Sequence, residues 1–142
     1  MTQLTYASGL LFTRAHKVVR TRIYTILDRY NLTLSDWTIL SITLRSPDGV
    51  RLASVAKQMD VKAPLVTMLA DELITKGLIS RIPHHSDRRA KLLIATAQGK
   101  KLASKIEKEL AAEITHLMDG ISASEGAAFQ KTLQTIIANA QD

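Results

Sequence analysis

Two short helical patterns that almost touch constrain the fold of this chain more than any other feature. The first consists of apolar residues at helical spacing, namely Leu52, Val55, Ala56 and Met59. A turn follows at Asp60 and Val61, and the second pattern begins near Pro64, a residue that suits a first helical turn. Two helices joined by so short a turn predict a helix-turn-helix motif.

The side chains that this motif needs stand at the right places. The helix crossing needs a small residue, which Ala56 provides, and the second helix needs apolar interior residues, which Val66 and Leu69 provide. The turn needs a residue that tolerates the left-handed conformation. Asp60 tolerates it, although glycine adopts it more easily. The pattern therefore agrees with the motif position by position.

A β-hairpin with a basic tip is predicted directly after the second helix. Lys76 and Gly77 supply a C-terminal cation and a helix-ending glycine. Residues 78–83 and 91–96 are short segments rich in Ile and Leu, and the polar run from His84 to Ala90 separates them. Helix, helix, turn, helix and hairpin is the order of a winged helix-turn-helix.

Long amphipathic helices are expected on both sides of this motif. One helical face of the N-terminal segment carries Phe12, Ala15, Val19, Ile23, Ile26 and Tyr30. Thr33 and Asp36 can cap a mostly buried second helix that ends before Pro47. A long C-terminal helix is predicted from the apolar series Leu102, Ile106, Leu110, Ile114, Leu117 and Ile121. Ser122 and Glu125 then form a capping box for the last helix.

Composition excludes several classes of protein. The 142 residues fit one domain or two tightly joined subdomains, and with 4% aromatic residues the core must be mainly aliphatic. The absence of cysteine excludes disulfides, thiolate metal sites, cysteine nucleophiles and thiol-based redox sensing. No export signal or membrane-spanning run is visible, so we expect a cytoplasmic protein.

The positive charge is concentrated in two blocks. The formal net charge is +6, a level at which an anionic polymer becomes a candidate partner. Residues 14–30 hold five bases and one acid, and residues 76–101 hold seven bases and one acid. The second block surrounds the predicted hairpin, where it favours contact with a nucleic acid duplex.

Three stretches of the chain resemble the MarR family of transcriptional regulators. They are residues 34–40 (LSDWTIL), residues 73–79 (LITKGLI) and, above all, residues 86–91 (SDRRAK) running into Thr96. The SlyA-like branch is one option within the family. The resemblance covers nearly the whole chain and implies a mainly α fold with a small β-hairpin. Residues 33–99 would be the winged DNA-binding module, and residues 1–32 and 100–142 a helical dimerisation region.

The resemblance also implies how DNA is bound. The helix from Pro64 would enter the major groove, Arg89 would reach into the minor groove, and Asp87 would brace the wing turn. Many relatives carry serine and arginine where this chain has Leu65 and Met68, which leaves Lys62, Thr67 and Asp71 as polar readers. Three further bases complete the predicted DNA-binding set, namely Arg81, Arg88 and Lys91.

The implied function is that of a homodimeric repressor released by a small aromatic or phenolic acid. Lys17, Arg20 and Trp37 occupy the matching positions for such a ligand. A rival hypothesis is an architectural or anti-silencing DNA-binding protein that responds to no ligand.

No cofactor is expected. An enzyme is not expected, because the His and Asp residues of the hairpin tip cannot surround a substrate carbonyl. The four histidines show no metal-ligand spacing.

Overall fold

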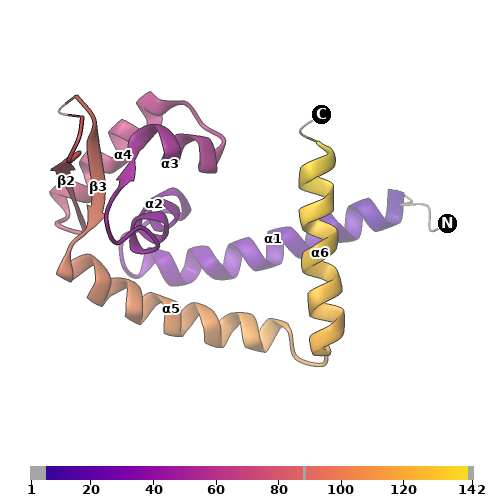
Figure 1. The fold of residues 1–142 in the computed structure, drawn as a ribbon. Helices are drawn as coiled ribbons and strands as arrows, with labels where there is room; N and C mark the ends of the chain where they lie inside the picture. The colour runs from indigo at the N-terminus through magenta and orange to yellow at the C-terminus, as the bar shows by residue number, and fades with distance from the viewer. Residues whose placement is uncertain (1–5, 88, 141–142) are drawn as a thin grey trace.

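The structure is a computed structural model that describes residues 6–87 and 89–140. Over these residues the chain is mainly helical with a small antiparallel sheet (Figure 1). The elements in chain order are α1 (Tyr6–Asp28), α2 (Leu34–Leu44), β1 (Val50–Arg51), α3 (Leu52–Met59), α4 (Ala63–Thr75), β2 (Ile79–Pro83), β3 (Lys91–Ala95), α5 (Ala97–Leu117) and α6 (Ala123–Asn139).

The sheet corrects the prediction of a simple hairpin, because it has a third strand. Its order is β1-β3-β2, with β1 antiparallel to β3 and Val50 opposite Leu93. Strand β1 contains only Val50 and Arg51, and the helical pattern begins at the next residue, so no alternation of apolar and polar residues marks it in the sequence. The hairpin strands themselves begin and end within a residue of their predicted bounds.

Helix α2 lies at the centre of the core, between α1 and the winged elements (Figure 1). Its N-terminus has the predicted capping box, in which the Asp36 backbone N–H donates to the Thr33 hydroxyl and the Thr33 backbone N–H donates to the Asp36 carboxylate. The core is aliphatic, as expected. Its fully buried large side chains include Leu27, Ile39, Leu40, Leu73, Ile79, Leu93 and Ile106.

Polar pairs join α1 to α5 outside this core. Arg29 and Tyr30 both donate hydrogen bonds to the Glu109 carboxylate, and Arg22 lies 3.3 Å from Glu113. The hydrogen bond to Glu109 raises the pKa of Tyr30, and the negative charge of that carboxylate adds to the rise. The end of α1 is thereby held against the middle of α5.

The junction between the sheet and α5 is close-packed. Gly99, in the first turn of α5, is buried against the backbone of Leu78 at the start of β2, and a Cβ built on Gly99 would lie 2.0 Å from the Leu78 carbonyl oxygen. The Thr96 hydroxyl caps α5 by accepting from the Gly99 N–H and also donates to the Gly77 carbonyl. Only glycine fits at residue 99.

Helix α5 ends earlier than its apolar periodicity predicts. Ile121 was expected to continue it, but α5 ends at Leu117 and Gly120 adopts a φ of 79°. The second predicted capping box is confirmed at the start of α6, where the Ser122 backbone N–H donates to the Glu125 carboxylate and the Glu125 backbone N–H donates to the Ser122 hydroxyl.

A search of the described residues finds no helix whose length and hydropathy would suit a membrane span.

Candidate nucleic-acid interface

The turn between α3 and α4 has the geometry that a helix-turn-helix requires. Asp60 adopts the left-handed conformation, with φ 54° and ψ 48°, and the Val61 N–H donates to the Ala56 carbonyl. Ala56 and Val66 are buried at the packing surface of the two helices. The predicted roles of Ala56, Asp60 and Val66 are confirmed by this geometry.

Helix α4 leaves its N-terminal half exposed. Lys62 is the N-cap, Pro64 lies in the first turn, and both side chains are exposed. Leu65 and Met68 are 40% and 52% exposed, so two large apolar side chains occupy the outer face of this helix. Thr67 is also exposed, and its hydroxyl donates to the Ala63 carbonyl. The outer face of α4 is therefore sparsely polar.

An ion pair changes the reading of two predicted DNA contacts. Arg81 on β2 donates to the Asp71 carboxylate of α4 at 2.5 Å. Asp71 and Arg81, both expected to contact DNA, are thus paired with each other across the recognition helix and β2. Both side chains are partly exposed, so the pair contributes little to stability.

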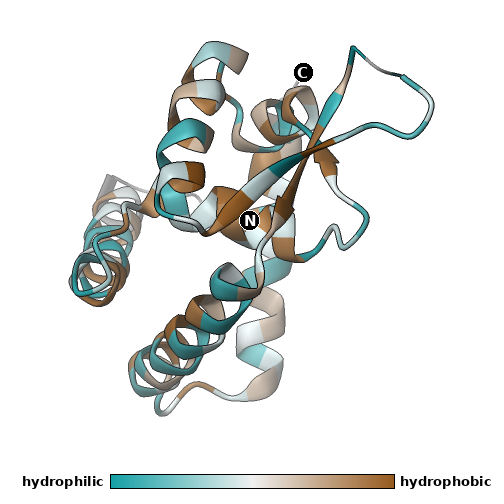
Figure 2. Ribbon diagram, turned by 90° about the vertical axis from the view of Figure 1, so that its left-hand side faces the viewer, coloured by the Kyte–Doolittle hydropathy of each residue, from teal (hydrophilic) through white to brown (hydrophobic). Residues whose placement is uncertain are grey.

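The wing tip is organised by hydrogen bonds to its backbone. The Asp87 carboxylate accepts from the Arg89 backbone N–H at 3.0 Å. This hydrogen bond orders the turn itself, in keeping with the expectation that Asp87 braces the wing turn. Arg89 and Lys91 are exposed, and the loop is hydrophilic in contrast to its strands (Figure 2). Arg88 lies outside the described residues.

His84 is a wing residue whose role the sequence analysis missed. Its Nδ1 atom accepts from the backbone N–H groups of Ser86 at 3.2 Å and Asp87 at 3.1 Å, which closes the turn that carries Arg89. Asn and Asp side chains often accept from backbone N–H groups two residues on. The signal was therefore an acceptor-bearing side chain two residues before the Ser86-Asp87 motif.

The residues predicted to bind an effector are not gathered into one site. Lys17 and Arg20 are exposed on α1, and the Arg20 guanidinium lies over the ring of Tyr24 and donates to its hydroxyl. Trp37 is half-buried and packs against the core. None of the three lines the cavity of about 420 Å³ between α1 and the start of α2, whose lining is Thr21, Tyr24, Thr25, Asp28, Leu32 and Thr33.

Comparison with known proteins agrees with the geometry of the helix-turn-helix and wing. The MarR family model matches residues 32–91. Every candidate DNA contact named above lies within the matched residues, whereas α1, α5 and α6 lie outside them.

Similarity to solved MarR family structures extends over nearly the whole chain. A MarR family transcriptional regulator from Rhodococcus sp. RHA1 is 26% identical with a TM-score of 0.81, over 96% of each chain. CouR from Rhodococcus jostii RHA1, solved with p-coumaroyl-CoA, is 27% identical with a TM-score of 0.84, over 96% of this chain and 95% of CouR. These neighbours are transcription regulators.

The same fold is present in a mutant of MarR from E. coli that was solved in complex with operator DNA. It is 18% identical with a TM-score of 0.79, over 92% of this chain and 94% of that one. The likeness covers 92% of this chain, so the shared fold includes the flanking helices as well as the winged elements.

Proposed function

We propose that the protein is a homodimeric, sequence-specific regulator of transcription that binds double-stranded DNA and represses its target genes. The observation that carries the proposal is the pairing of an exposed recognition helix, α4, with a wing whose turn is closed around Arg89. A helix in the major groove and an arginine in the adjacent minor groove together read a short site. We place such a protein in the cytoplasm, with the genome.

The proposed dimer rests on the apolar faces of the flanking helices. Helix α6 has no buried residue of its own, and Phe129, Ile136 and Ile137 on it are 53%, 47% and 60% exposed. Leu11 and Phe12 of α1 are similarly exposed, and a cavity of about 460 Å³ with almost wholly apolar walls lies between α1 and α6. Helix α6 crosses α1 well away from the winged elements (Figure 1).

A second copy of the chain would bury these faces, because exposed apolar patches of this size mark interaction surfaces. We therefore assign residues 1–32 and 100–142 to a dimerisation region and residues 33–99 to the DNA-binding module. Two-fold symmetry then places the two α4 helices on half-sites about 34 Å apart on a pseudo-palindromic operator.

The proposed effector is a small aromatic carboxylate or phenolic acid. Lys17 and Arg20 place cationic groups on the exposed face of α1, near the 420 Å³ cavity at the start of α2. CouR supports this class, since it was solved with an aromatic acyl thioester. A ligand here would change the angle between dimer base and winged module, with a coupling free energy of about 1 to 3 kcal/mol.

One observation favours a second candidate function. Leu65 and Met68 leave the outer face of α4 poor in hydrogen-bonding groups, so direct base readout is limited and wing contacts carry more of the affinity. A protein of this kind suits an architectural or anti-silencing role, in which it displaces other proteins from DNA and responds to no ligand.

DNase footprinting on the DNA upstream of its own and neighbouring genes tests these alternatives. The repressor proposal expects two protected half-sites about one helical turn apart, released by millimolar salicylate or a related phenolic acid. Protection that no acid in the panel changes would support the ligand-independent alternative. Absence of any protected site, with binding equal on all duplexes, would contradict sequence-specific regulation.

A further inference from the structure

The hydrogen bonds around His84 fix which of its ring nitrogens carries a proton. Two backbone N–H groups, from Ser86 and Asp87, point at Nδ1 from 3.2 and 3.1 Å. A backbone N–H can only donate, so Nδ1 must be an unprotonated acceptor. The neutral imidazole of His84 consequently carries its hydrogen on Nε2 and presents it as a donor.

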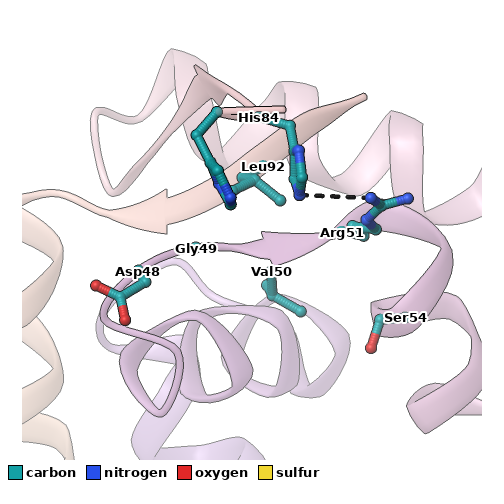
Figure 3. Close-up of a pocket in the computed structure, with 8 residues that line it drawn as sticks. Asp48, Gly49, Val50, Arg51, Ser54, His84 and Leu92 are labelled. Carbon is teal, nitrogen blue, oxygen red and sulfur yellow. Dashed lines mark hydrogen bonds between the residues drawn. The ribbon is translucent and has the colours of Figure 1, made fainter. Parts of the chain in front are cut away.

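This donor faces another donor. Nε2 of His84 lies 3.4 Å from a terminal guanidinium nitrogen of Arg51, the two atoms that the dashed line joins in Figure 3, and the tautomer set at Nδ1 makes both of them donors. Guanidinium groups have no acceptor, so neither side chain satisfies the other. An acceptor placed at the open side of both groups would receive a hydrogen bond from each, one of them charge-assisted.

The sheet holds the two donors at this separation. Arg51 is opposite Leu92 in the β1–β3 ladder, and the His84 backbone N–H donates to the Ala90 carbonyl across the base of the wing loop. The two side chains line one open cavity of about 410 Å³, together with Ser54 on α3 and the stacked ring of His85. Asp48 lines the far end of this cavity and points away from the pair (Figure 3).

We propose that Arg51 and the Nε2–H of His84 form an anion site that binds one phosphate of the DNA backbone. This inference rests on the proposed function. Arg51 directly precedes α3, the first helix of the helix-turn-helix, which in this docking geometry crosses the DNA backbone. His84 directly precedes the loop that carries Arg89. A phosphate between them lies on the path of a duplex that contacts both elements.

A duplex with one neutral methylphosphonate linkage, moved along each strand of the footprinted operator, tests this site. At one position per half-site, removing the charge should weaken binding of the wild-type protein about tenfold, the effect expected of a charge-assisted contact. Arg51→Ala removes this contact from both half-sites of the proposed dimer, so it should bind the unmodified duplex up to about a hundredfold more weakly and show almost no further loss at that position. Its salt slope should fall by about 0.9 for each lost contact.

Substitutions at His84 separate the anion site from the structure of the wing. His84→Asn keeps an acceptor for the Ser86 and Asp87 N–H groups but removes the Nε2–H, so the amide NMR signals of the wing should persist while sensitivity to the methylphosphonate falls. His84→Ala should lose both the wild-type amide signals of the wing and the sensitivity to the methylphosphonate. Lys108→Ala, at an exposed site on α5 that does not line this cavity, is the control and should behave like the wild type.

The outcomes are distinct. If every methylphosphonate position lowers the DNA affinity of the wild-type protein and of Arg51→Ala by the same factor, the assignment of Arg51 and His84 to a backbone phosphate is overturned. It is also overturned if inorganic phosphate shifts the signals of Arg51 and His84 while no single linkage matters, since the site then serves a free anion. If the wild-type protein binds no duplex, the proposed function fails before this test begins.

Discussion

Asp87 shows how a single side chain can prepare the wing for DNA. Its carboxylate accepts from the backbone N–H of Arg89, and His84 accepts from the N–H of Asp87 itself. The turn is therefore closed before DNA arrives, which reduces the conformational entropy that binding must offset. The exposed Arg89 guanidinium stays free to enter a narrow minor groove, where negative potential is concentrated.

Replacing Arg89 should weaken binding to all duplexes. Arg89→Ala is expected to lower affinity for operator and non-operator DNA alike, and to reduce the slope of log affinity against log salt by about 0.9 for each lost phosphate contact. Fluorescence anisotropy at several salt concentrations measures both. Lys105→Ala, which removes one exposed positive charge from α5 outside residues 32–91, is the control. Unchanged affinity of Arg89→Ala would exclude the proposed wing contact.

Glu125 links the stability of α6 to pH. Its pKa is lowered from 4.5 because the carboxylate accepts a hydrogen bond from the backbone N–H of Ser122. A lowered folded-state pKa means that this stabilisation is present above about pH 4.5 and is lost as the pH falls through the folded value. Acidification should therefore weaken the capping box at the start of α6.

Glu125→Gln should make this part of the pH dependence disappear. The amide can keep the capping geometry but cannot titrate, so the variant should be slightly less stable at neutral pH and should lose less stability than the wild type between about pH 5 and 3. Thermal unfolding followed by circular dichroism across this range gives the comparison. Glu107→Gln, at an exposed site within α5, should show the wild-type profile.

At the scale of the element, local chemistry predicted the helices well. Thr33 with Asp36 and Ser122 with Glu125 marked two helix starts to the residue, because a capping box is a pattern of neighbours. Gly77 marked the end of α4 for the same reason, since its φ of 75° is available to glycine. Signals of this kind involve residues that are close in sequence.

The elements that were missed depend on partners far away in the chain. Strand β1 exists only because Val50 and Arg51 pair with β3, some forty residues later. Apolar periodicity predicted that α5 continues through Ile121, whereas the helix ends at Leu117 and Gly120 adopts a positive φ in the turn that follows. In the candidate site, the resemblance to the MarR family implied that Leu65 and Met68 lie on the outer face of the recognition helix. The Asp71–Arg81 pair and the contact of Arg51 with His84 join residues of different elements, so no local pattern predicts them.

Gly99 offers a sharp test of the junction between the sheet and α5. Gly99→Ala should destabilise the protein by about 1 to 3 kcal/mol, because its Cβ would overlap the Leu78 carbonyl oxygen and the backbone must move. The control is Gly9→Ala in α1, where the added Cβ meets no atom within 4 Å and helix propensity favours alanine by up to about 1 kcal/mol. Urea unfolding measures both. Equal stability of the two variants would contradict the close packing.

At the scale of the whole molecule, the proposed operator contact needs two chains. Each protomer offers one α4 and one wing, and the apolar faces of α1 and α6 lie at the other end of the fold (Figure 1). A dimer joined there would double the number of phosphate contacts without any new contact within a protomer. Affinity and salt dependence are therefore properties of the dimer, and they should change together when the interface is broken.

Ile137→Glu should produce a monomer. Ile137 is 60% exposed in one chain, so the substitution should change the stability of the isolated fold by no more than about 0.5 kcal/mol, yet it places a charge in the proposed interface. Sedimentation velocity should show one chain, and the salt slope of DNA binding should be roughly halved. Thr132→Glu, about 140° away around α6, should remain dimeric. A dimeric Ile137→Glu variant would place the interface elsewhere.

The glycine contact at the start of α5 has a mechanical consequence. Because Gly99 packs directly on the backbone of Leu78, and Thr96 bonds to Gly77, the helix and the sheet must turn as one body. Helix α5 has 21 residues and is about 32 Å long, so it is a rigid lever. A rotation of about 5° at one end displaces the other by about 3 Å, comparable to the rise of one base pair along a duplex. In the proposed dimer, a small tilt of α5 within the dimerisation region would thus displace both wings from the positions at which they meet the grooves of the DNA.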